Sequence, residues 1–229
     1  NDYDRARDQD VFLAKVDFQM DPRHRVTVRY NHQNYTGQNG ETSGTTNAEE
    51  HSGDSLVRTR SVNGSLSSVF SPTFFNELRL QWAQDKEPGE ANTNDPETLV
   101  NQNGQRVLTF GRNNFSPRET TIKRFQVADT ATWVRGVHSL KAGFDYNHDD
   151  ILNFFPGFFG GNYTFASLAS FNRGVPSGAG ESFQQNFAGL GTTGATTEPN
   201  INEFALFLQD EWRLNKDVTL SLGVRYDVQ

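Results

Sequence analysis

The chain of 229 residues contains no cysteine, which excludes disulfide bridges and thiolate-bound metal sites. Long apolar runs are also missing, since the longest one, 204–208, is far shorter than the ~18 residues that a membrane-spanning helix needs. An excess of basic residues is absent too: the net charge is −7, which argues against nucleic acid as a partner. We therefore expect neither a helical membrane span nor a nucleic-acid interface.

Motifs for catalysis are missing as well. The sequence contains no H-E-x-x-H, no G-x-S-x-G and no Walker-type phosphate loop. We predict that the protein is not an enzyme, and we expect no catalytic residue, no cofactor and no metal site.

Aromatic residues, in contrast, are plentiful. Hydrophobic residues make up only 34% of the sequence, yet 12% of all residues are aromatic and 19 of them are Phe. A disordered chain would be poor in aromatic residues. We therefore expect these rings to pack against a surface.

Alternation of apolar and polar residues with a period of two recurs along the chain and predicts β-strands. Residues 12–20 alternate, "DPRH" at 21–24 is typical of a turn, and residues 26–30 alternate again, which together predict a hairpin. Three further hairpins are predicted at about 55–82, 121–146 and 203–226, with turns at 71–72, 135–136 and 215–217. The result is about eight strands of about ten residues, longer than the usual five or six of soluble sheets.

The connections between these strands alternate between short and long. Turns of about two to four residues close each hairpin, whereas long linkers rich in Gly, Asn, Thr and Ser, expected to be structureless, occupy roughly 36–54, 85–120 and 155–202. Outer-membrane barrels have short periplasmic turns and long extracellular loops. We therefore predict an all-β fold, an antiparallel up-and-down transmembrane β-barrel segment in the outer membrane of a bacterium.

The alternation also predicts which side chains face lipid. Leu140, Ala142, Phe144 and Tyr146 are expected on the lipid side, and Lys141, Gly143, Asp145 and Asn147 on the side of the lumen or plug. Aromatic residues near the predicted strand ends suit an interfacial girdle. They are Trp82, Trp133, Tyr146, Trp212 and Tyr226.

Three stretches resemble the barrel of TonB-dependent outer-membrane receptors. "FLQDEWRLNKDVTLSLGVRYD" at 207–227 has a Q-D-x-W strand, a polar turn and an L-x-L-x-x-G-x-R-Y strand, and "GVHSLKAGFDY" at 136–146 is similar to another hairpin of that family. "FSPTFFNELRLQW" at 70–82 resembles a hairpin of the Oar-like branch.

The resemblance implies a barrel of about 22 strands filled by an N-terminal plug. It also implies energised uptake of a scarce, unknown external ligand, with outer-membrane lipid, the plug domain and the TonB complex as partners. No TonB box, plug or terminal strand ending in an aromatic residue is found in residues 1–229. We therefore expect the chain to be an internal part of one barrel domain, with the TonB contact made by an N-terminal region outside it. Two alternatives remain: a small self-contained outer-membrane β-barrel and a soluble β-sandwich module for adhesion or binding.

The third long linker contains the most unusual segment, "FFPGFFGGNYTFASLASF" at 154–171. Exposed apolar patches of this size usually contact something. One interpretation is that the loop packs on the barrel mouth and buries its own rings. The other is a surface that captures a ligand or partner, formed by Phe154, Phe155, Phe158, Phe159 and Tyr163.

Four short motifs receive plainer interpretations. "GLGTTG" at 189–194 is expected to be an external loop, because neither a strand before it nor a helix after it is predicted. "EEHSGD" at 49–54 is interpreted as a solvated acidic loop, with a calcium site as the alternative. "NQNG" at 101–104 and "GQNG" at 37–40 are expected to form turns.

The stretch "VHSLKAGFDYNHDD" at 137–150 resembles a cluster of metal ligands when it is read as a list. In a strand with a rise of about 3.3 Å per residue, however, His138 and His148 lie roughly 33 Å apart and cannot share a metal ion. A cation held at the rim by His148 and Asp150 is the remaining hypothesis, and we do not favour it.

Overall fold

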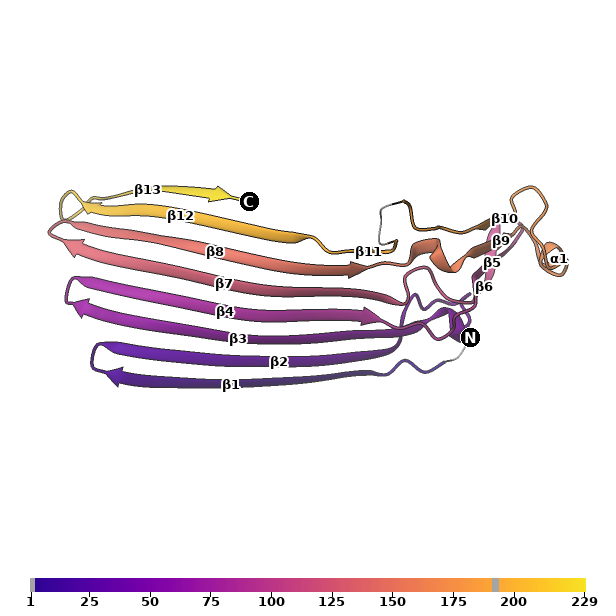
Figure 1. Ribbon diagram of the computed structural model, residues 1–229, viewed down its shortest axis with the longest axis horizontal. Coiled ribbons are helices and arrows are strands. Elements are labelled where there is room, and N and C mark those ends of the chain that lie inside the picture. The colour runs from indigo at the N-terminus through magenta and orange to yellow at the C-terminus, as the bar shows by residue number, and fades with distance from the viewer. Residues whose placement is uncertain (1–2, 191–193) are drawn as a thin grey trace.

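The structure is a computed structural model that describes residues 3–190 and 194–229. Eight long strands lie side by side in one antiparallel sheet, in the order in which they occur along the chain (Figure 1). They are β1 (Arg7–Asp21), β2 (His24–Glu41), β3 (Gly53–Ser71), β4 (Phe74–Gly89), β7 (Arg118–Arg135), β8 (His138–Phe154), β12 (Asn200–Arg213) and β13 (Thr219–Val228). A ninth, very short strand, β11 (Thr196–Thr197), pairs with the end of β8.

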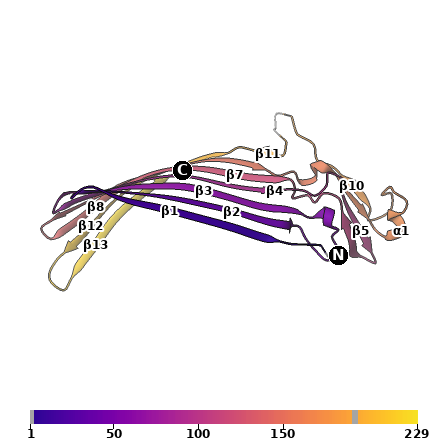
Figure 2. The same cartoon turned by 90° about the horizontal axis from the view of Figure 1, so that it is seen from below.

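The sheet is curved and open. Figure 2 shows its curvature from the side. Within the described residues β1 pairs with β2 and β13 pairs with β12, so the first and the last strand are free edges and the eight long strands do not close on one another. The predicted all-β, up-and-down barrel segment with about eight strands is confirmed.

Short turns connect the strands at one end of the sheet, as predicted. In the first, the Asp21 carboxylate accepts hydrogen bonds from the backbone N–H groups of Arg23 and His24. In the last, the Asn215 side chain accepts from the backbone N–H of Asp217. Side chains of this type stabilise tight turns by replacing a backbone partner.

The register places most of the apolar residues of the eight long strands on one face. Residues paired directly across strands share a face, and one such row contains Val16, Val28, Gly64, Leu80, Val127, Tyr146, Phe204 and Val228. The next row, on the opposite face, contains Lys15, Arg29, Asn63, Gln81, Gln126, Asn147 and Glu203. The predicted separation of Leu140, Ala142, Phe144 and Tyr146 from their alternate neighbours follows this pattern.

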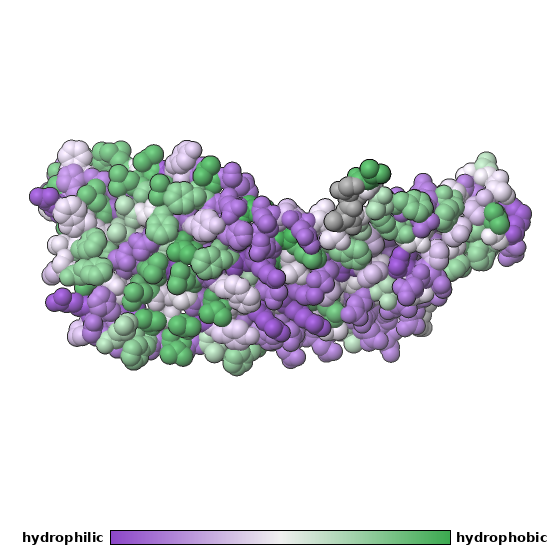
Figure 3. Space-filling model, viewed as in Figure 1, coloured by the Kyte–Doolittle hydropathy of each residue, from purple (hydrophilic) through white to green (hydrophobic). Residues whose placement is uncertain are grey.

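The apolar side chains cover only the half of the sheet next to the short turns, while polar side chains cover the half that leads to the loops (Figure 3). Higher on the same face, one row contains His32, Arg60, Gln84, Lys123, Asp150 and Asn200. The strands therefore extend well beyond the apolar band. This length corrects the expectation that the aromatic girdle marks strand ends, because Trp82 and Tyr146 lie mid-strand.

Aromatic residues mark the two borders of the band instead. On β4, Phe74 lies near the turn border and Trp82 near the loop border. At a rise of about 3.3 Å these two residues lie about 26 Å apart along the strand, or about 20 Å along the membrane normal for a strand tilted by about 40°. The band therefore has roughly the height of the apolar belt of outer-membrane barrels, ~25 Å, once the rings are included.

The long linkers are not structureless, which corrects a second expectation. They contain the outer ends of the long strands and a second, smaller sheet in the order β10-β9-β5-β6. The strands of this outer sheet are β5 (Glu97–Gln102), β6 (Gln105–Phe110), β9 (Asn162–Phe165) and β10 (Ser182–Gln184). Three short helices accompany it: η1 (Glu49–His51), η2 (Gly157–Gly160) and α1 (Leu168–Phe171).

The two Asn-Gly motifs behave differently. "NQNG" ends in Asn103 and Gly104, which have φ of 51° and 75° and form the turn between β5 and β6, as predicted. "GQNG", in contrast, lies inside β2, where the register with β3 shifts between Gly37 and Glu41. The prediction of a turn there is wrong, because a bulge takes up the positive φ of Asn39 within the strand.

Candidate functional site

The polar face of the large sheet carries a ladder of paired charges. Arg124 donates two hydrogen bonds to Asp149 at 2.8 and 2.7 Å, and the Gln126 side chain donates to Asp145 at 2.9 Å. Arg124, Gln126 and Asp145 contribute to the wall of a cavity of about 450 Å³, together with Glu203 and others. Such a surface suits a polar interior, because these charged and amide groups have partners within the wall.

Two acidic residues, Asp129 and Asp210, lie within the apolar band, and sequence reasoning missed them. Asp210 accepts a hydrogen bond from Nδ1 of His138 at 2.7 Å, and Asp129 accepts from Asn76 at 2.8 Å. His138 also stacks on Trp212, near the short turns. Each carboxylate is thus paired within the sheet, which lowers the cost of placing it among apolar neighbours.

The outer sheet brings together three linkers that are far apart in sequence. Strand β5 comes from the second linker and runs parallel to β9 from the third, with Glu97 opposite Asn162. The first linker joins them through an isolated bridge between Asn47 and Thr109 of β6. This arrangement creates a site that no single linker contains.

One face of the outer sheet forms a small aromatic core. Phe165 packs edge-on against Phe171 of α1, which packs edge-on against Phe110 of β6. Tyr163 stacks with Phe165 and contacts Phe183 of β10 at 4.5 Å between ring centroids. These rings hold α1 and β10 on the sheet.

The other face borders an open cavity of about 520 Å³. Its charged and aromatic lining residues are His51, Glu97, Arg106 and Phe158. Threonine, asparagine and glutamine side chains supply much of the rest, including Thr42, Asn47, Thr109, Asn162, Thr164 and Gln184. We refer to this cavity as the outer pocket.

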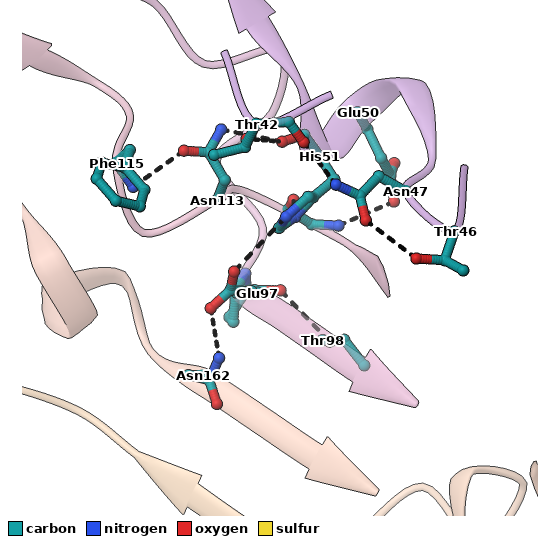
Figure 4. Close-up of polar contacts among 12 residues, drawn as sticks. Thr42, Thr46, Asn47, Glu50, His51, Glu97, Thr98, Asn113, Phe115 and Asn162 are labelled. Atoms are coloured by element: carbon teal, nitrogen blue, oxygen red, sulfur yellow. Dashed lines mark hydrogen bonds and ion pairs between the residues drawn. The ribbon is translucent and has the colours of Figure 1, made fainter. Parts of the chain in front are cut away.

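His51 and Glu97 form the buried centre of the outer pocket (Figure 4). His51 is 5% exposed and Glu97 7% exposed. Nε2 of His51 lies 3.7 Å from Oε1 of Glu97, and the other carboxylate oxygen accepts a hydrogen bond from the Asn162 side chain. The interpretation of "EEHSGD" as a solvated acidic loop is therefore wrong at His51 and at Ser52, which is 1% exposed.

The backbone around His51 is fixed by side chains from two other segments. Its carbonyl oxygen accepts hydrogen bonds from the Asn113 amide at 2.9 Å and from the Thr42 hydroxyl at 3.0 Å. Ser52 donates to the Glu49 carbonyl oxygen at 2.6 Å. The ring of His51 is thus held by a rigid local framework.

The five aromatic residues predicted as a capture surface are spread over different surroundings. Phe158 lines the outer pocket, whereas Tyr163 belongs to the aromatic core on the opposite face of β9. Phe155 packs edge-on against Phe115, and Phe154 ends β8 opposite Thr196. The Phe159 backbone accepts a hydrogen bond from the Gln185 side chain. Of the five, Phe158 alone is among the residues that border the outer pocket.

The remaining motifs add no further cluster of ligands. His148 lies 3.2 Å from Asp150, but within the described part of the chain no group of three or more His, Asp or Glu could hold a metal ion. "GLGTTG" includes residues 191–193, which lie outside the described residues. None of the described helices is long and apolar enough to cross a membrane.

Comparison with known proteins identifies the family. A family model described as an outer membrane beta barrel domain matches residues 2–229. The chain belongs to this family. It is therefore a segment of a bacterial outer-membrane β-barrel, as the resemblance implied.

Solved outer-membrane proteins share its fold. The chain superposes on the ferric-catecholate import receptor Fiu of Escherichia coli K12 with a TM-score of 0.62 and 11% identity, covering 97% of this chain and 34% of that one. For the outer membrane transporter YddB of Escherichia coli the TM-score is 0.57 at 13% identity, covering 96% and 27%. For FpvA of P. aeruginosa, solved with bound pyoverdines, the values are 0.59 and 12%, covering 96% and 30%.

These similarities establish the fold of this chain over nearly its whole length. The chain spans about a third of the length of these solved chains. A comparison with curated proteins gives no match.

Proposed function

We propose that this chain is part of the barrel wall of a TonB-dependent receptor for energised uptake of a scarce ligand. The observation that carries the proposal is the division of one curved sheet into an apolar face and a charged face, with strands that continue beyond the apolar band into a folded cap. A wall of this kind separates lipid from a polar interior. The named structural neighbours, which include an import receptor and a transporter, support the same assignment.

The partners follow from the two faces. Outer-membrane lipid would cover the apolar face. A plug domain would lie against the ladder of Arg124, Asp149, Gln126 and Asp145, where hydrogen-bonding groups are already ordered. The TonB complex would contact an N-terminal region outside residues 1–229, and the hairpin at 70–82 supports placing the protein in the Oar-like branch.

The outer pocket is the part of the chain that we propose contacts the external ligand. It combines the ring of Phe158 with charged and amide side chains, and binding sites commonly combine an apolar wall with a few placed polar groups. We expect Phe158→Ala to weaken function more than Phe155→Ala, because Phe155 packs on Phe115 instead.

Complementation in cells tests this expectation without a known ligand. A strain lacking the gene is grown under the nutrient limitation that reveals its defect, and each variant is returned at equal outer-membrane abundance. We expect Phe155→Ala to restore growth. The Phe158→Ala variant, and the double variant in which Phe159 is also replaced by Ala, should restore growth poorly. Full growth with the double variant would contradict a role of these rings in capture.

Binding to TonB tests energised uptake directly. The full-length protein is passed over the immobilised periplasmic domain of TonB from the same organism. We expect it to be retained, and a version without its N-terminal TonB-binding segment to pass through. Failure of the full-length protein to bind would contradict TonB-coupled uptake and leave the barrel fold unaffected.

A further inference from the structure

A cluster of basic residues lies just beyond the apolar band, on the same face of the large sheet. Trp82 of β4 and Val62 of β3 are paired at the loop border of that band. Arg60 and Arg58 lie two and four residues beyond Val62 on β3, so their side chains share its face. Lys86 of β4 is paired directly with Arg58. We refer to Arg58, Arg60 and Lys86 as the basic patch.

The basic patch lies at the depth of lipid headgroups. For a rise of about 3.3 Å per residue and a tilt of about 40°, Arg60 and Arg58 lie about 5 and 10 Å beyond Val62 along the membrane normal. The headgroup layer adds about 5–8 Å to each side of the hydrocarbon core. The surface of the sheet changes from apolar to polar at this level (Figure 3). Because the long loops of outer-membrane barrels are extracellular, the patch faces the headgroups of the outer leaflet.

The two arginines of the patch have no counter-charge within the sheet. Both are exposed, and among the residues that the structure describes neither makes an ion pair or a side-chain hydrogen bond. Like charges directly opposite each other on neighbouring strands are destabilising, and Arg58 lies opposite Lys86. Lys86 has a partner of its own, since its Nζ lies 2.9 Å from a carboxylate oxygen of Glu119. The charges of Arg58 and Arg60 are therefore available to an external anion.

The cross-strand neighbours of the arginines carry no negative charge. On β2 and β4 these neighbours are His32, Asn34, Gln84 and Lys86. The acidic residues of this face lie further along the sheet. Lys123 of β7 is paired with Asp150 of β8, and both line a cavity of about 540 Å³ together with Glu198. Acidic groups thus surround Lys123 but not the two arginines, so we assign the anion to Arg58 and Arg60.

We infer that the basic patch binds the headgroup of an outer-leaflet lipid that carries a phosphate monoester. Such a group has a charge of about −1.5 to −2 at pH 7, which matches two unpaired arginines better than the single charge of a phosphodiester. A guanidinium group donates two parallel N–H groups to phosphate oxygens. The Cα atoms of Arg58 and Arg60 lie about 6.6 Å apart along the strand, so their long side chains can converge on one phosphate.

The rings next to the patch favour a lipid over free phosphate. Trp82 and Phe125 are paired across β4 and β7, and they are 43% and 45% exposed. Interfacial aromatic residues pack where the acyl chains of a lipid join its headgroup. A phosphorylated lipid can therefore contact the rings and the arginines together, whereas inorganic phosphate contacts only the arginines, in competition with water.

This inference deepens one part of the proposed function, the contact with outer-membrane lipid, and rests on that part alone. It does not depend on TonB coupling or on the external ligand. Failure of the lipid contact would abolish retention of every phospholipid by the purified protein. Failure of headgroup recognition would abolish only the preference among phospholipids, so the two failures can be distinguished.

The experiment is native mass spectrometry of the full-length protein in detergent micelles, titrated with phospholipids that share the same acyl chains. Phosphatidic acid carries a phosphate monoester, phosphatidylglycerol an anionic diester, and phosphatidylcholine a diester balanced by choline. We expect phosphatidic acid to bind about 5-fold more tightly than phosphatidylglycerol, and phosphatidylcholine to bind most weakly. Replacing both Arg58 and Arg60 by Gln should weaken binding of phosphatidic acid about 20-fold and remove this preference.

Arg29 supplies the matched control for this double variant. It is also an exposed arginine, but it lies on the polar face of the sheet, opposite Asn63. Arg29→Gln should therefore leave the binding of phosphatidic acid unchanged. Lys123→Gln should change it little, because Lys123 already lies opposite Asp150.

Three results would overturn the inference. The first is equal binding of phosphatidic acid by wild type and the double variant, with normal heat-modifiable migration of both as evidence of folding. The second is equal affinity of wild type for phosphatidic acid and phosphatidylglycerol, which would indicate general charge attraction without recognition of a monoester. The third is displacement of bound phosphatidic acid by excess inorganic phosphate, which would identify the patch as a site for the free anion.

Discussion

A single glycine illustrates how tightly the wall is built. A Cβ on Gly143 would overlap the backbone oxygen of Asp129 and the ring of Phe207, which covers Gly143 on the polar face. A Cβ on Gly64 would meet nothing within 4 Å. We expect Gly143→Ala to cost about 1–3 kcal/mol through overpacking and Gly64→Ala to be neutral or stabilising by about 0.5–1 kcal/mol. Urea unfolding of the full-length protein in lipid vesicles measures both, and equal stability of the two variants would contradict this packing.

The division between faces can be tested at two adjacent residues of β12. Leu208 lies among the apolar residues, opposite Ala142 and Val224, whereas Gln209 lies on the polar face opposite Lys141. We expect Leu208→Arg to lower the free energy of unfolding by about 2–4 kcal/mol, as a charge in mid-membrane does. Gln209→Arg should have a much smaller effect. The same vesicle assay compares them, and a larger loss at Gln209 would reverse the assignment of faces.

For single residues, the sequence predicts well which face of the sheet a side chain occupies, but it predicts poorly which other residue that side chain contacts. Because side chains alternate strictly along a strand, the faces of Leu140 to Asn147 follow from position alone. The pairing of His51 with Glu97 does not, since it depends on how two linkers fold against a third. The pairs of Asp210 with His138 and Asp129 with Asn76 were missed for the same reason: each joins different strands.

At the scale of the elements, the conformation of the segment between β9 and β10 depends on the carboxylate of Glu181. Glu181 accepts hydrogen bonds from the backbone N–H groups of Ser177 and Gly178 at 2.8 Å and from Arg173 at 3.0 Å. A hydrogen bond with the Ser170 side chain, followed by these backbone N–H groups, lowers the pKa of Glu181 from 4.5 to about 2. The carboxylate therefore orders the segment from α1 to β10.

The consequence is a dependence of local order on pH. Since the folded-state pKa is lowered, the contribution of Glu181 is fully present above about 4.5 and is lost as the pH falls through about 2. We expect hydrogen-exchange protection of the Ser177 and Gly178 amides at pH 6 and its loss in Glu181→Gln. In wild type the protection should fade as the pH is lowered from about 4.5 to about 2. Protection that is the same in wild type and Glu181→Gln would show that the backbone alone holds this segment.

One hairpin of the outer sheet could be predicted from the sequence, whereas the other strand pairings could not. The Asn-Gly pair between "TLVNQ" and "QRVLTF" is a strong hairpin motif, and the β5–β6 hairpin could have been predicted from it. The parallel pairing of β5 with β9 could not, because these strands are short and their partners lie in different linkers. Local pattern thus specifies a hairpin, while the pairing of linkers depends on the long strands that bring them together.

For the whole molecule, the sequence predicted the order of the eight long strands, the grouping of the short turns at one end of the sheet, and which residues form the apolar face. All three follow from alternation and turn residues, which are local. It did not predict how far the strands extend beyond the membrane, since outside the apolar band both faces are polar and the alternation disappears. Trp82 is an example: it lies at the border of the apolar band that faces the loops, yet it is in the middle of β4 because the strand continues beyond the band.

The position of the membrane along these strands gives a prediction for the whole molecule. Because residues 1–229 contain no cysteine, single cysteines can be introduced here without background from this part of the protein. Val175 is 65% exposed and lies between α1 and β10, and Arg23 lies in the turn between β1 and β2. The outer cap with α1 and β10 and the turn that joins β1 to β2 are at opposite ends of the structure (Figure 1). In intact cells, a membrane-impermeant maleimide should label Val175→Cys and spare Arg23→Cys until the outer membrane is permeabilised. Leu80→Cys, on the apolar face, should resist the reagent in both conditions. Labelling of Arg23→Cys but not of Val175→Cys in intact cells would place the short turns outside, and the outer pocket could then not meet an external ligand.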